Sequence, residues 1–293
     1  MSLWWLVKFC LSIWWAMRET PFWTFGWDKY MSKVSIIIPT YNSGEYILES
    51  VDSALSQIYE DKEVIVVDDG STDRTRTVLD EYVSAGKIRY FYQDRSGVAK
   101  ARNFGLSQAG GELVAFLDAD DVWKIDKLER QIKLFVNSTI GLVYSDMEFF
   151  GVGRLVGKRF SDIARLRRGR VIEELIGENF ISTSTVVTRR ELVNKVGGFD
   201  EEFSIGEDYA LWLKIARIAS VDFSAEALVQ YRIHAKQSSE SAYKTYKSMA
   251  RLWKKLAGDP GFGVWEARIK QNYRKSLIKM IIRRIWPAHG VEA

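Results

Sequence analysis

From residue 33 onward the chain alternates between two periodicities. Short apolar runs rich in β-branched and aromatic residues lie at 34–38, 63–68, 87–92 and 112–118. Amphipathic stretches with helical spacing lie between them, at 44–57, 72–84 and 97–109. Strand and helix alternating at this spacing predict βαβ units. We therefore expect an α/β fold with a Rossmann-like, mostly parallel sheet and helices on both faces.

Polar residues follow each predicted strand. Pro39 should end the first strand, and Thr40 and Tyr41 come after it. The residues that follow the other three strands are polar or charged as well: Asp68 and Asp69, then Arg102 in the next helix, then Asp118, Asp120 and Asp121. Because ligands bind beyond the carboxyl ends of the strands in such sheets, we expect these side chains to line one cleft.

Three carboxylates within four residues, Asp118, Asp120 and Asp121, directly follow an apolar run. Like charges this close repel one another, and carboxylates beside a core are costly without partners. The cluster therefore predicts a positive charge next to it. For the letters DADD in isolation, a capped turn with solvated acids is the alternative.

Charge is distributed unevenly along the chain. Residues 240–286 hold 12 Lys and Arg against 3 Asp and Glu, whereas residues 1–239 hold 30 against 34. A nucleic-acid binder should carry a basic face on its body, so we expect no nucleic-acid partner. The single cysteine, Cys10, excludes a disulfide framework and a cysteine metal cluster, and it fits a cytoplasmic location.

We expect three regions along the chain. Residues 33–239 form the α/β domain, residues 1–32 are a Trp-rich N-terminal extension, and residues 240–293 are a basic tail of two amphipathic helices. Basic amphipathic helices with Trp suit the surface of an anionic membrane, which predicts peripheral contact at a cytoplasmic face. The alternative is that their apolar stripes pack on the domain, and a dimer is also open.

The stretch 3–17 is apolar but falls short of the ~20 residues that a spanning helix needs. Its Trp pairs suit a membrane interface. The alternative is that Met31 is the natural start and residues 1–30 are an upstream extension.

Five segments together resemble a known family: VSIIIPTYNSGEYILESVDSALSQ, EVIVVDDGSTDRT, SGVAKARNFGLSQAGGELVAFLDADD, VGGFDEEFSIGEDYALWLKIA and YRIHAKQSS. In order and spacing they resemble family 2 glycosyltransferases of the GT-A fold, from about Val34 to Ser239. The resemblance implies an inverting, hexosyltransferase-like enzyme. Such an enzyme moves a sugar from a nucleoside diphosphate to a hydroxyl of a glycan or a lipid-linked acceptor, as in surface polysaccharide or glycolipid synthesis.

The resemblance also implies a donor site. DADD resembles the family's DXD motif, with Mg²⁺ or Mn²⁺ held by Asp118 and Asp120 and neutralising the donor diphosphate; Asp118 could instead contact the ribose. Asp69 resembles the acid that accepts a hydrogen bond from the ring N–H of the nucleobase. The wall against which the base rests would be Pro39, Thr40 and Tyr41. A ring N–H favours a UDP-sugar, with thymine and guanine nucleotides open.

The acceptor site follows from the ED motif. Asp208 resembles the family's catalytic base, which takes the proton of the acceptor hydroxyl, and Glu207 would support it or bind acceptor. His234 resembles a histidine that ligates the metal or contacts the diphosphate, with a surface residue as the alternative. Arg102 could approach the diphosphate or form a salt bridge with an acid of the cleft.

Two other functions are compatible with a nucleotide-binding α/β domain. A nucleotidyltransferase would need a Gly-rich, basic triphosphate site near the first strand, and PTYNSGEY supplies neither feature. A catalytically silent nucleotide-sugar-binding module would lack the base or the metal acids, and Asp120 and Asp208 are both present. The residues therefore favour the transferase.

Overall fold

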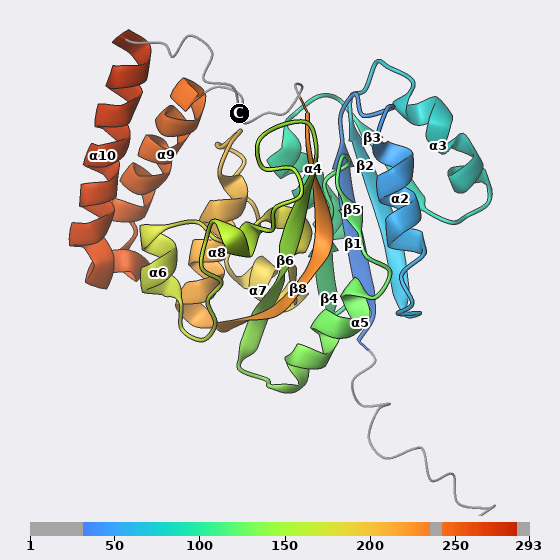
Figure 1. The fold of residues 1–293 in the computed structure, drawn as a ribbon, viewed down its shortest axis with the longest axis horizontal. Helices are drawn as coiled ribbons and strands as arrows, with labels where there is room; N and C mark the ends of the chain where they lie inside the picture. Colours follow the sequence, from blue (N-terminus) through green and yellow to red (C-terminus); the bar gives the residue numbers. More distant parts are fainter. Residues whose placement is uncertain (1–31, 235–241, 286–293) are drawn as a thin grey trace, which may run out of the picture. The chain divides into compact units, whose positions relative to one another are not determined.

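The computed structural model describes residues 32–234 and 242–285 (Figure 1). The strands are β1 Val34–Thr40, β2 Lys62–Asp69, β3 Arg89–Gln93, β4 Leu113–Phe116, β5 Val122–Trp123, β6 Ile140–Gly151, β7 Val187–Arg189 and β8 Ser220–Ile233. The α-helices are α2 Ile47–Leu55, α3 Thr75–Ser84, α4 Val98–Gln108, α5 Lys127–Ile132, α6 Ile172–Gly177, α7 Arg190–Lys195, α8 Glu207–Ile218, α9 Ala242–Ala257 and α10 Glu266–Ile285. The predicted strands and helices of the first half are all present.

The strands form one eight-stranded sheet in the order β3-β2-β1-β4-β7-β6-β8-β5. Four of its seven pairings are parallel, namely β1–β2, β1–β4, β2–β3 and β6–β8. The pairs β4–β7 and β6–β7 are both antiparallel, so β6 and β8 run in the same direction as β1. The carboxyl ends of β1, β2, β3, β4, β6 and β8 therefore meet at one edge of the sheet, which we call the carboxyl edge. The predicted α/β fold class is confirmed.

The strand β1 runs through Pro39 instead of ending there, which corrects one expectation. Its carbonyl at Ile37 accepts a hydrogen bond from Leu117 N on the β4 side, and Pro39, two residues on, faces the same side. The paired register of β1 with β4 ends at Ile37. Because no ladder hydrogen bond is required from Pro39 on that side, its missing N–H costs nothing.

Alternating side chains of the central strands pack into two separate hydrophobic cores, one on each face of the sheet. Ile37, Ile65 and Val67 belong to one core with residues of α4, α6 and α8. Ile36 and Val64 belong to the other, with residues of α2, α3 and α5. The central strands are therefore covered by helices on both faces, as the apolar runs predicted.

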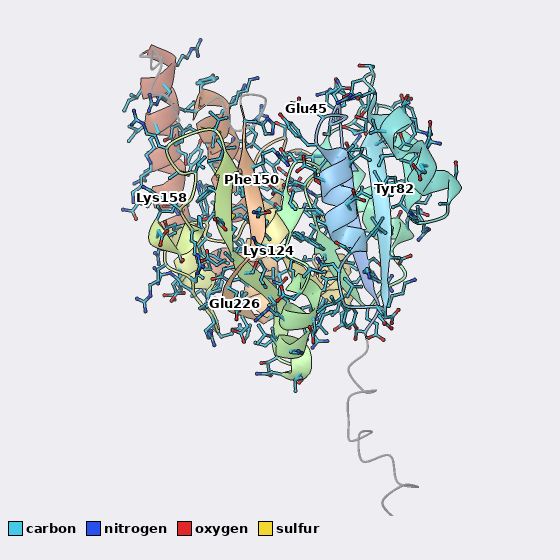
Figure 2. The ribbon with its side chains drawn as sticks, turned by 45° about the vertical axis from the view of Figure 1, so that its right-hand side comes forward. Glu45, Tyr82, Lys124, Phe150, Lys158 and Glu226 are labelled. Carbon is cyan, nitrogen blue, oxygen red and sulfur yellow. The ribbon has the colours of Figure 1, made fainter. Side chains whose placement is uncertain are left out.

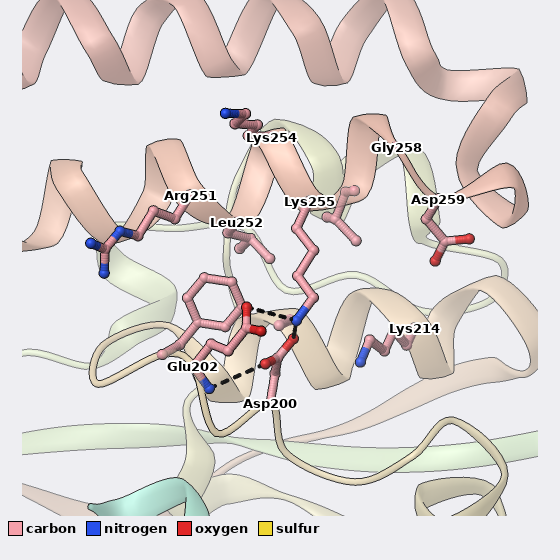
Figure 3. A pocket seen from close by; sticks show the side chains of 12 residues that line it. Asp200, Glu202, Lys214, Arg251, Leu252, Lys254, Lys255, Gly258 and Asp259 are labelled. Atoms are coloured by element: carbon pink, nitrogen blue, oxygen red, sulfur yellow. Dashed lines mark hydrogen bonds and ion pairs between the residues drawn. The ribbon is translucent and has the colours of Figure 1, made fainter.

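The tail helices α9 and α10 pack on the same unit as the sheet. Leu252, Trp253 and Leu256 of α9 are buried in the core that α8 completes. Lys255 also pairs with Asp200 at 2.6 Å and Glu202 at 3.0 Å, across a cavity of about 870 Å³ between α8 and α9 (Figure 3). The apolar stripe of α9 therefore faces the domain, and packing, the alternative to membrane contact, is correct for this helix.

The Trp-rich residues 1–31 lie outside the described residues, so an interfacial helix there stays a prediction. Within 32–234 and 242–285, no helix combines the length and the hydropathy that crossing a bilayer requires.

Candidate active site

Arg102 of α4 joins two acidic motifs that are far apart in the sequence. Its Nη2 donates to Oδ1 of Asp118 at 2.7 Å, and its Nη1 donates to Oε1 of Glu207 at 2.6 Å. Arg102 is only 3% exposed. The structure thus brings three predicted site residues together, with Arg102 in the salt bridge that was the alternative to diphosphate contact.

The charge of Arg102 is set by its surroundings. Burial acts to lower the pKa of the guanidinium, but the carboxylates of Asp118, Glu207 and Asp208 outweigh burial and raise the pKa above its usual value. A buried charge is tolerated only when it is paired and hydrogen-bonded, so these acids stabilise the buried guanidinium of Arg102.

Asp120 has a different partner. His234 follows the end of β8, and its Nε2 lies 2.9 Å from Oδ2 of Asp120. Arg232 of β8 donates from Nε to the carbonyl of Asp120 at 2.8 Å. Burial, and secondly the charge of Asp118, raise the pKa of Asp120. His234 is therefore part of the acidic cluster at the carboxyl edge, not an isolated surface residue.

Asp121 is a structural acid. Its side chain is buried and accepts hydrogen bonds from Ser184 Oγ at 2.6 Å and from the backbone N of Arg232 at 3.0 Å. Burial, and then the charges of Asp120 and Asp118, raise its pKa well above the usual value. Of the three acids, Asp118 and Asp120 are the ones with side chains about a third exposed. The positive charge expected beside the cluster is Arg102, which pairs with Asp118, and Asp120 lies against the imidazole of His234.

The predicted metal ligands are only partly assembled. Asp120 and His234 together offer a carboxylate oxygen and an imidazole nitrogen, a donor pair compatible with Mn²⁺. Asp118 is turned to Arg102. Within the described residues, no group of three His, Cys, Asp or Glu side chains is arranged to hold a metal ion. Two of the three predicted ligands fit a metal, and the third would have to release Arg102.

Asp208 stands in the first turn of α8. Its Oδ2 accepts from Thr183 Oγ1 at 2.8 Å, and its Oδ1 accepts from the backbone N of Tyr209 at 2.7 Å. Gly206, at φ 82°, caps the helix in a left-handed conformation that glycine adopts without strain. A helix N-terminus favours negative charge, which suits a carboxylate that must act as a base.

The predicted nucleobase wall lies at the end of β1. Pro39 and Thr40 are buried, and Oγ1 of Thr40 has no hydrogen-bond partner in the described residues. Tyr41 is exposed, with the guanidinium of Arg95 3.4 Å from its ring centroid. An aromatic face with a neighbouring guanidinium can stack against a planar base.

Asp69 holds the connection between β3 and α4. Its Oδ1 accepts from Gln93 Nε2 at 2.7 Å and from the backbone N of Ser96 at 2.8 Å. Its Oδ2 accepts from the backbone N of Gly97 at 2.8 Å. The neighbouring Asp68 accepts from Tyr90 Oη at 2.6 Å. Asp69 therefore fixes a loop of the cleft, and its contact with a nucleobase stays a prediction.

Thr183 and Ser184 were not predicted to be site residues. Both are buried in the connection before β7 and contact Asp208 and Asp121, respectively. Their signal in the sequence is weak, since a short Ser/Thr run before a strand is common in loops. Arg95 was missed as well, because its approach to Tyr41 depends on how the β3–α4 loop folds over Gly70.

The fold and these clustered motifs define a glycosyltransferase of the GT-A class. TarS of S. aureus in complex with UDP-GlcNAc superposes with a TM-score of 0.64 at 24% identity, over 88% of this chain and 76% of that chain. The mannosyltransferase PcManGT of Pyrobaculum calidifontis, in complex with GDP-Man and Mn²⁺, gives 0.63 at 22% identity, over 96% and 83%. At these identities the likeness concerns the fold.

Residues 35–197 match glycosyl transferase family 2, and the chain belongs to this family. A relative in Escherichia coli, the UDP-Glc:alpha-D-GlcNAc-diphosphoundecaprenol beta-1,3-glucosyltransferase WfgD, is 34% identical over 77% of this chain and 85% of its own length. An uncharacterized glycosyltransferase of Rickettsia typhi is 33% identical over 77% and 72%. The resemblance of the five segments is thus confirmed, and family membership favours the transferase over the two alternative functions.

Proposed function

We propose that the protein is an inverting transferase that moves a sugar from a UDP-sugar to a hydroxyl of a glycan or a lipid-linked acceptor. The observation that carries this proposal is the buried bridge from Asp118 through Arg102 to Glu207. It places the DADD acids and the ED acids of α8 at one site on the carboxyl edge. A transferase needs both sets together, since one handles the leaving diphosphate and the other the attacking hydroxyl.

Asp208 is the proposed base. One in-line displacement with a carboxylate base inverts the anomeric carbon, so an α-linked donor gives a β-linked product. Thr183 and the backbone N of Tyr209 hold the carboxylate in position. Glu207 is turned away to Arg102, so its proposed role is to position that cation and, through it, Asp118.

Asp118, Asp120 and His234 are the residues that would hold Mg²⁺ or Mn²⁺. The metal would supply positive charge to neutralise the leaving diphosphate. Asp120 and His234 are already within hydrogen-bond distance of each other. The pKa of Asp120 is raised first by burial and then by the charge of Asp118. A bound cation would offset both effects, so the raised pKa is compatible with a metal ligand. Manganese in the complex of PcManGT supports this assignment.

Uracil is the proposed base of the donor nucleotide. TarS is described with UDP and with UDP-GlcNAc, and the name of WfgD includes UDP-Glc. Pro39, Thr40 and Tyr41 would form the wall for the base, and Asp69 would accept the ring N–H beside them. The complex of PcManGT with GDP-Man makes guanine the competing base.

A lipid-linked acceptor is favoured over a free glycan by the diphosphoundecaprenol in the name of WfgD. Such an acceptor would require contact with the cytoplasmic face of a membrane. It would place the enzyme in surface polysaccharide or glycolipid synthesis.

Residues 33–239 are the proposed catalytic region, residues 1–32 an N-terminal extension and residues 240–293 a tail.

Calorimetric titration of UDP and GDP, with and without Mn²⁺, tests this proposal. We expect Mn²⁺-dependent binding of UDP that is lost in Asp120→Asn and retained in Asp208→Asn, because the base does not hold the metal. Asp208→Asn should instead lower the rate of transfer by about 10² to 10⁴-fold. Binding of GDP alone would overturn the UDP assignment, and binding of neither nucleotide would overturn the donor site.

A further inference from the structure

The second tail helix, α10, has two apolar faces. Its inner face packs on the domain, with Ile269 fully buried and Tyr273 against the same core. Three isoleucines point the other way: Ile278, Ile281 and Ile282 are 57%, 50% and 54% exposed. Ile281 and Ile282 follow Ile278 by three and four residues, so the three side chains form one stripe on the outside of the helix. Unlike the apolar stripe of α9, this outer stripe of α10 does not pack on the domain.

Within the described part of α10, cations border the exposed stripe. Lys275 and Lys279 lie along one side of it, and Arg284 follows on the other. From Ala267 to Ile285 the helix contains no Asp or Glu. An apolar stripe with a purely basic border is complementary to a surface that is apolar inside and anionic at its rim.

A second apolar and basic segment projects from the carboxyl end of β6. Val152 is 77% exposed and Val156 is 43% exposed. The cations Arg154 and Lys158 are exposed in the same loop. The backbone N of Val152 donates to the carbonyl of Ile233 at 3.0 Å, one residue before His234. The loop 152–158 therefore starts beside the acidic cluster.

Both segments lie at the end of the unit where the carboxyl edge of the sheet lies. In Figure 1 the loop after β6 and the C-terminal end of α10 are at the upper end, where β1 also ends. Lys279 of α10 lies 5.3 Å from the ring centroid of Tyr246 in α9. Ser248, half a turn further along α9, donates to the carbonyl of Ile205, directly before α8 and Asp208.

Side chains in Figure 2 agree with this placement. Phe150, at the base of the loop, and Glu45, between β1 and α2, lie toward the upper end of the sheet, and Glu226 lies toward the other end. The loop 152–158 thus lies at the carboxyl edge, and the C-terminal part of α10 lies at the same end of the unit.

We propose that the outer stripe of α10 and the loop 152–158 form one docking surface for an anionic lipid membrane. The surface turns the carboxyl edge toward the bilayer, which would bring a lipid-linked hydroxyl within reach of Asp208. A second copy of the chain fits less well, since a two-fold contact would set each basic border against itself. The purpose of the surface rests on the proposed function, but its test does not.

Sedimentation with vesicles of phosphatidylcholine, with and without phosphatidylglycerol, measures docking in the full chain. We expect binding that needs the anionic lipid and weakens with salt. The triple variant of Ile278→Ser, Ile281→Ser and Ile282→Ser should lose affinity for these vesicles by about tenfold or more. The matched control is Val264→Ser, because Val264 is 91% exposed but lies in the 3-10 helix Pro260–Trp265, directly before the N-terminal end of α10.

Site-specific fluorescence identifies the face that meets the lipid even if residues 1–31 also bind. In a Cys10→Ser background, an environment-sensitive label is attached at Val152→Cys, Ile281→Cys or Val264→Cys. Labels at 152 and 281 should shift to the blue on anionic vesicles, and the label at 264 should not. A label at 152 or 281 that stays in water overturns the surface, as does a concentration-dependent dimer that removes the shift. Calorimetric binding of UDP to the same variants reports separately on the proposed donor site.

Discussion

Among the described residues, Arg102 and Lys127 are two cations that the fold buries in opposite ways. Arg102 has a carboxylate on each side, Asp118 and Glu207. Lys127, the first residue of α5, is fully buried and donates to the amide oxygen of Gln131 at 2.6 Å. Its other partner is the ring of Trp123, 4.0 Å from Nζ to the centroid. Burial lowers the pKa of Lys127 well below its usual value, whereas the acids raise that of Arg102.

Burial alone does not decide the charge of a side chain. Both cations lose their water, and the difference lies in what replaces it. The acids beside Arg102 belong to the candidate active site, and they keep the guanidinium charged. The amide oxygen and the ring beside Lys127 carry no full negative charge, so burial prevails and lowers the pKa of the amine.

Of the substitutions at these two cations and their partners, Arg102→Met should change the free energy of unfolding the most. The substitution leaves Asp118 and Glu207 facing each other without their cation, so we expect the free energy of unfolding to fall by about 3–5 kcal/mol. Urea denaturation at neutral pH measures this change. Arg102→Lys should lose less, because one ammonium can pair with one acid but cannot bridge both.

The matched control for Arg102 is Arg76→Met. Arg76 pairs with Asp80 at 2.9 Å, but both side chains are about half exposed, so the variant should unfold like the wild type. If Arg102→Met also unfolded like the wild type, the bridge would not hold the two motifs together.

Glu207→Gln should have a smaller effect than the loss of the arginine. The amide oxygen of Gln can still accept from Nη1, while Asp118 remains as the charged partner, so we expect a loss of about 1–2 kcal/mol. A double-mutant cycle with Asp118→Asn measures how strongly the two acids are coupled through Arg102. Additive losses would mean that the two contacts act independently.

Lys127→Met should stabilise the protein, whereas the substitutions at Arg102 and Glu207 should destabilise it. A methionine of similar length removes the cost of burying an amine, so we expect a gain on the order of 1–2 kcal/mol at pH 7. Thermal unfolding measures it, with the exposed Lys133→Met as the control. A loss of stability would show that the contact with Trp123 outweighs the burial of the amine.

The gain from Lys127→Met should also depend on pH. The pKa of Lys127 is lower in the folded protein than the 10.5 of a free lysine, so the unfolded chain binds more protons between the two values. The wild type therefore becomes more stable as the pH rises through that window. The advantage of the variant should shrink over the same window and vanish above pH 10.5. An advantage independent of pH would contradict a lowered pKa.

The first half of the fold was predictable because each βα unit is local. The helix between β1 and β2 follows from a periodicity that a single stretch of sequence contains. The second half was not, since β5 has two residues and β7 three, too few to show a period. The strands β6 and β8 are long but pair with register shifts near Ser145, which interrupt the alternation of side chains.

The candidate site was predictable as a set of residues but not as a set of contacts. Asp118, Asp120, Glu207 and Asp208 stand in motifs that the sequence displays. The choice of Arg102 between a diphosphate and a salt bridge depends on how closely α4 approaches α8. Similarly, the pairing of His234 with Asp120 requires β8 to end at the carboxyl edge, which periodicity alone does not indicate.

The packing of α9 against α8 sets the smallest fragment that can fold as an enzyme. The family match ends at residue 197, before α8 begins, so a fragment with those bounds lacks Asp208 and leaves Arg102 without Glu207. A fragment that stops after β8 would keep both acids but would expose the side of α8 that Leu252 and Trp253 cover. The compact unit of this protein therefore extends beyond the family match, through α8 and the tail helices α9 and α10.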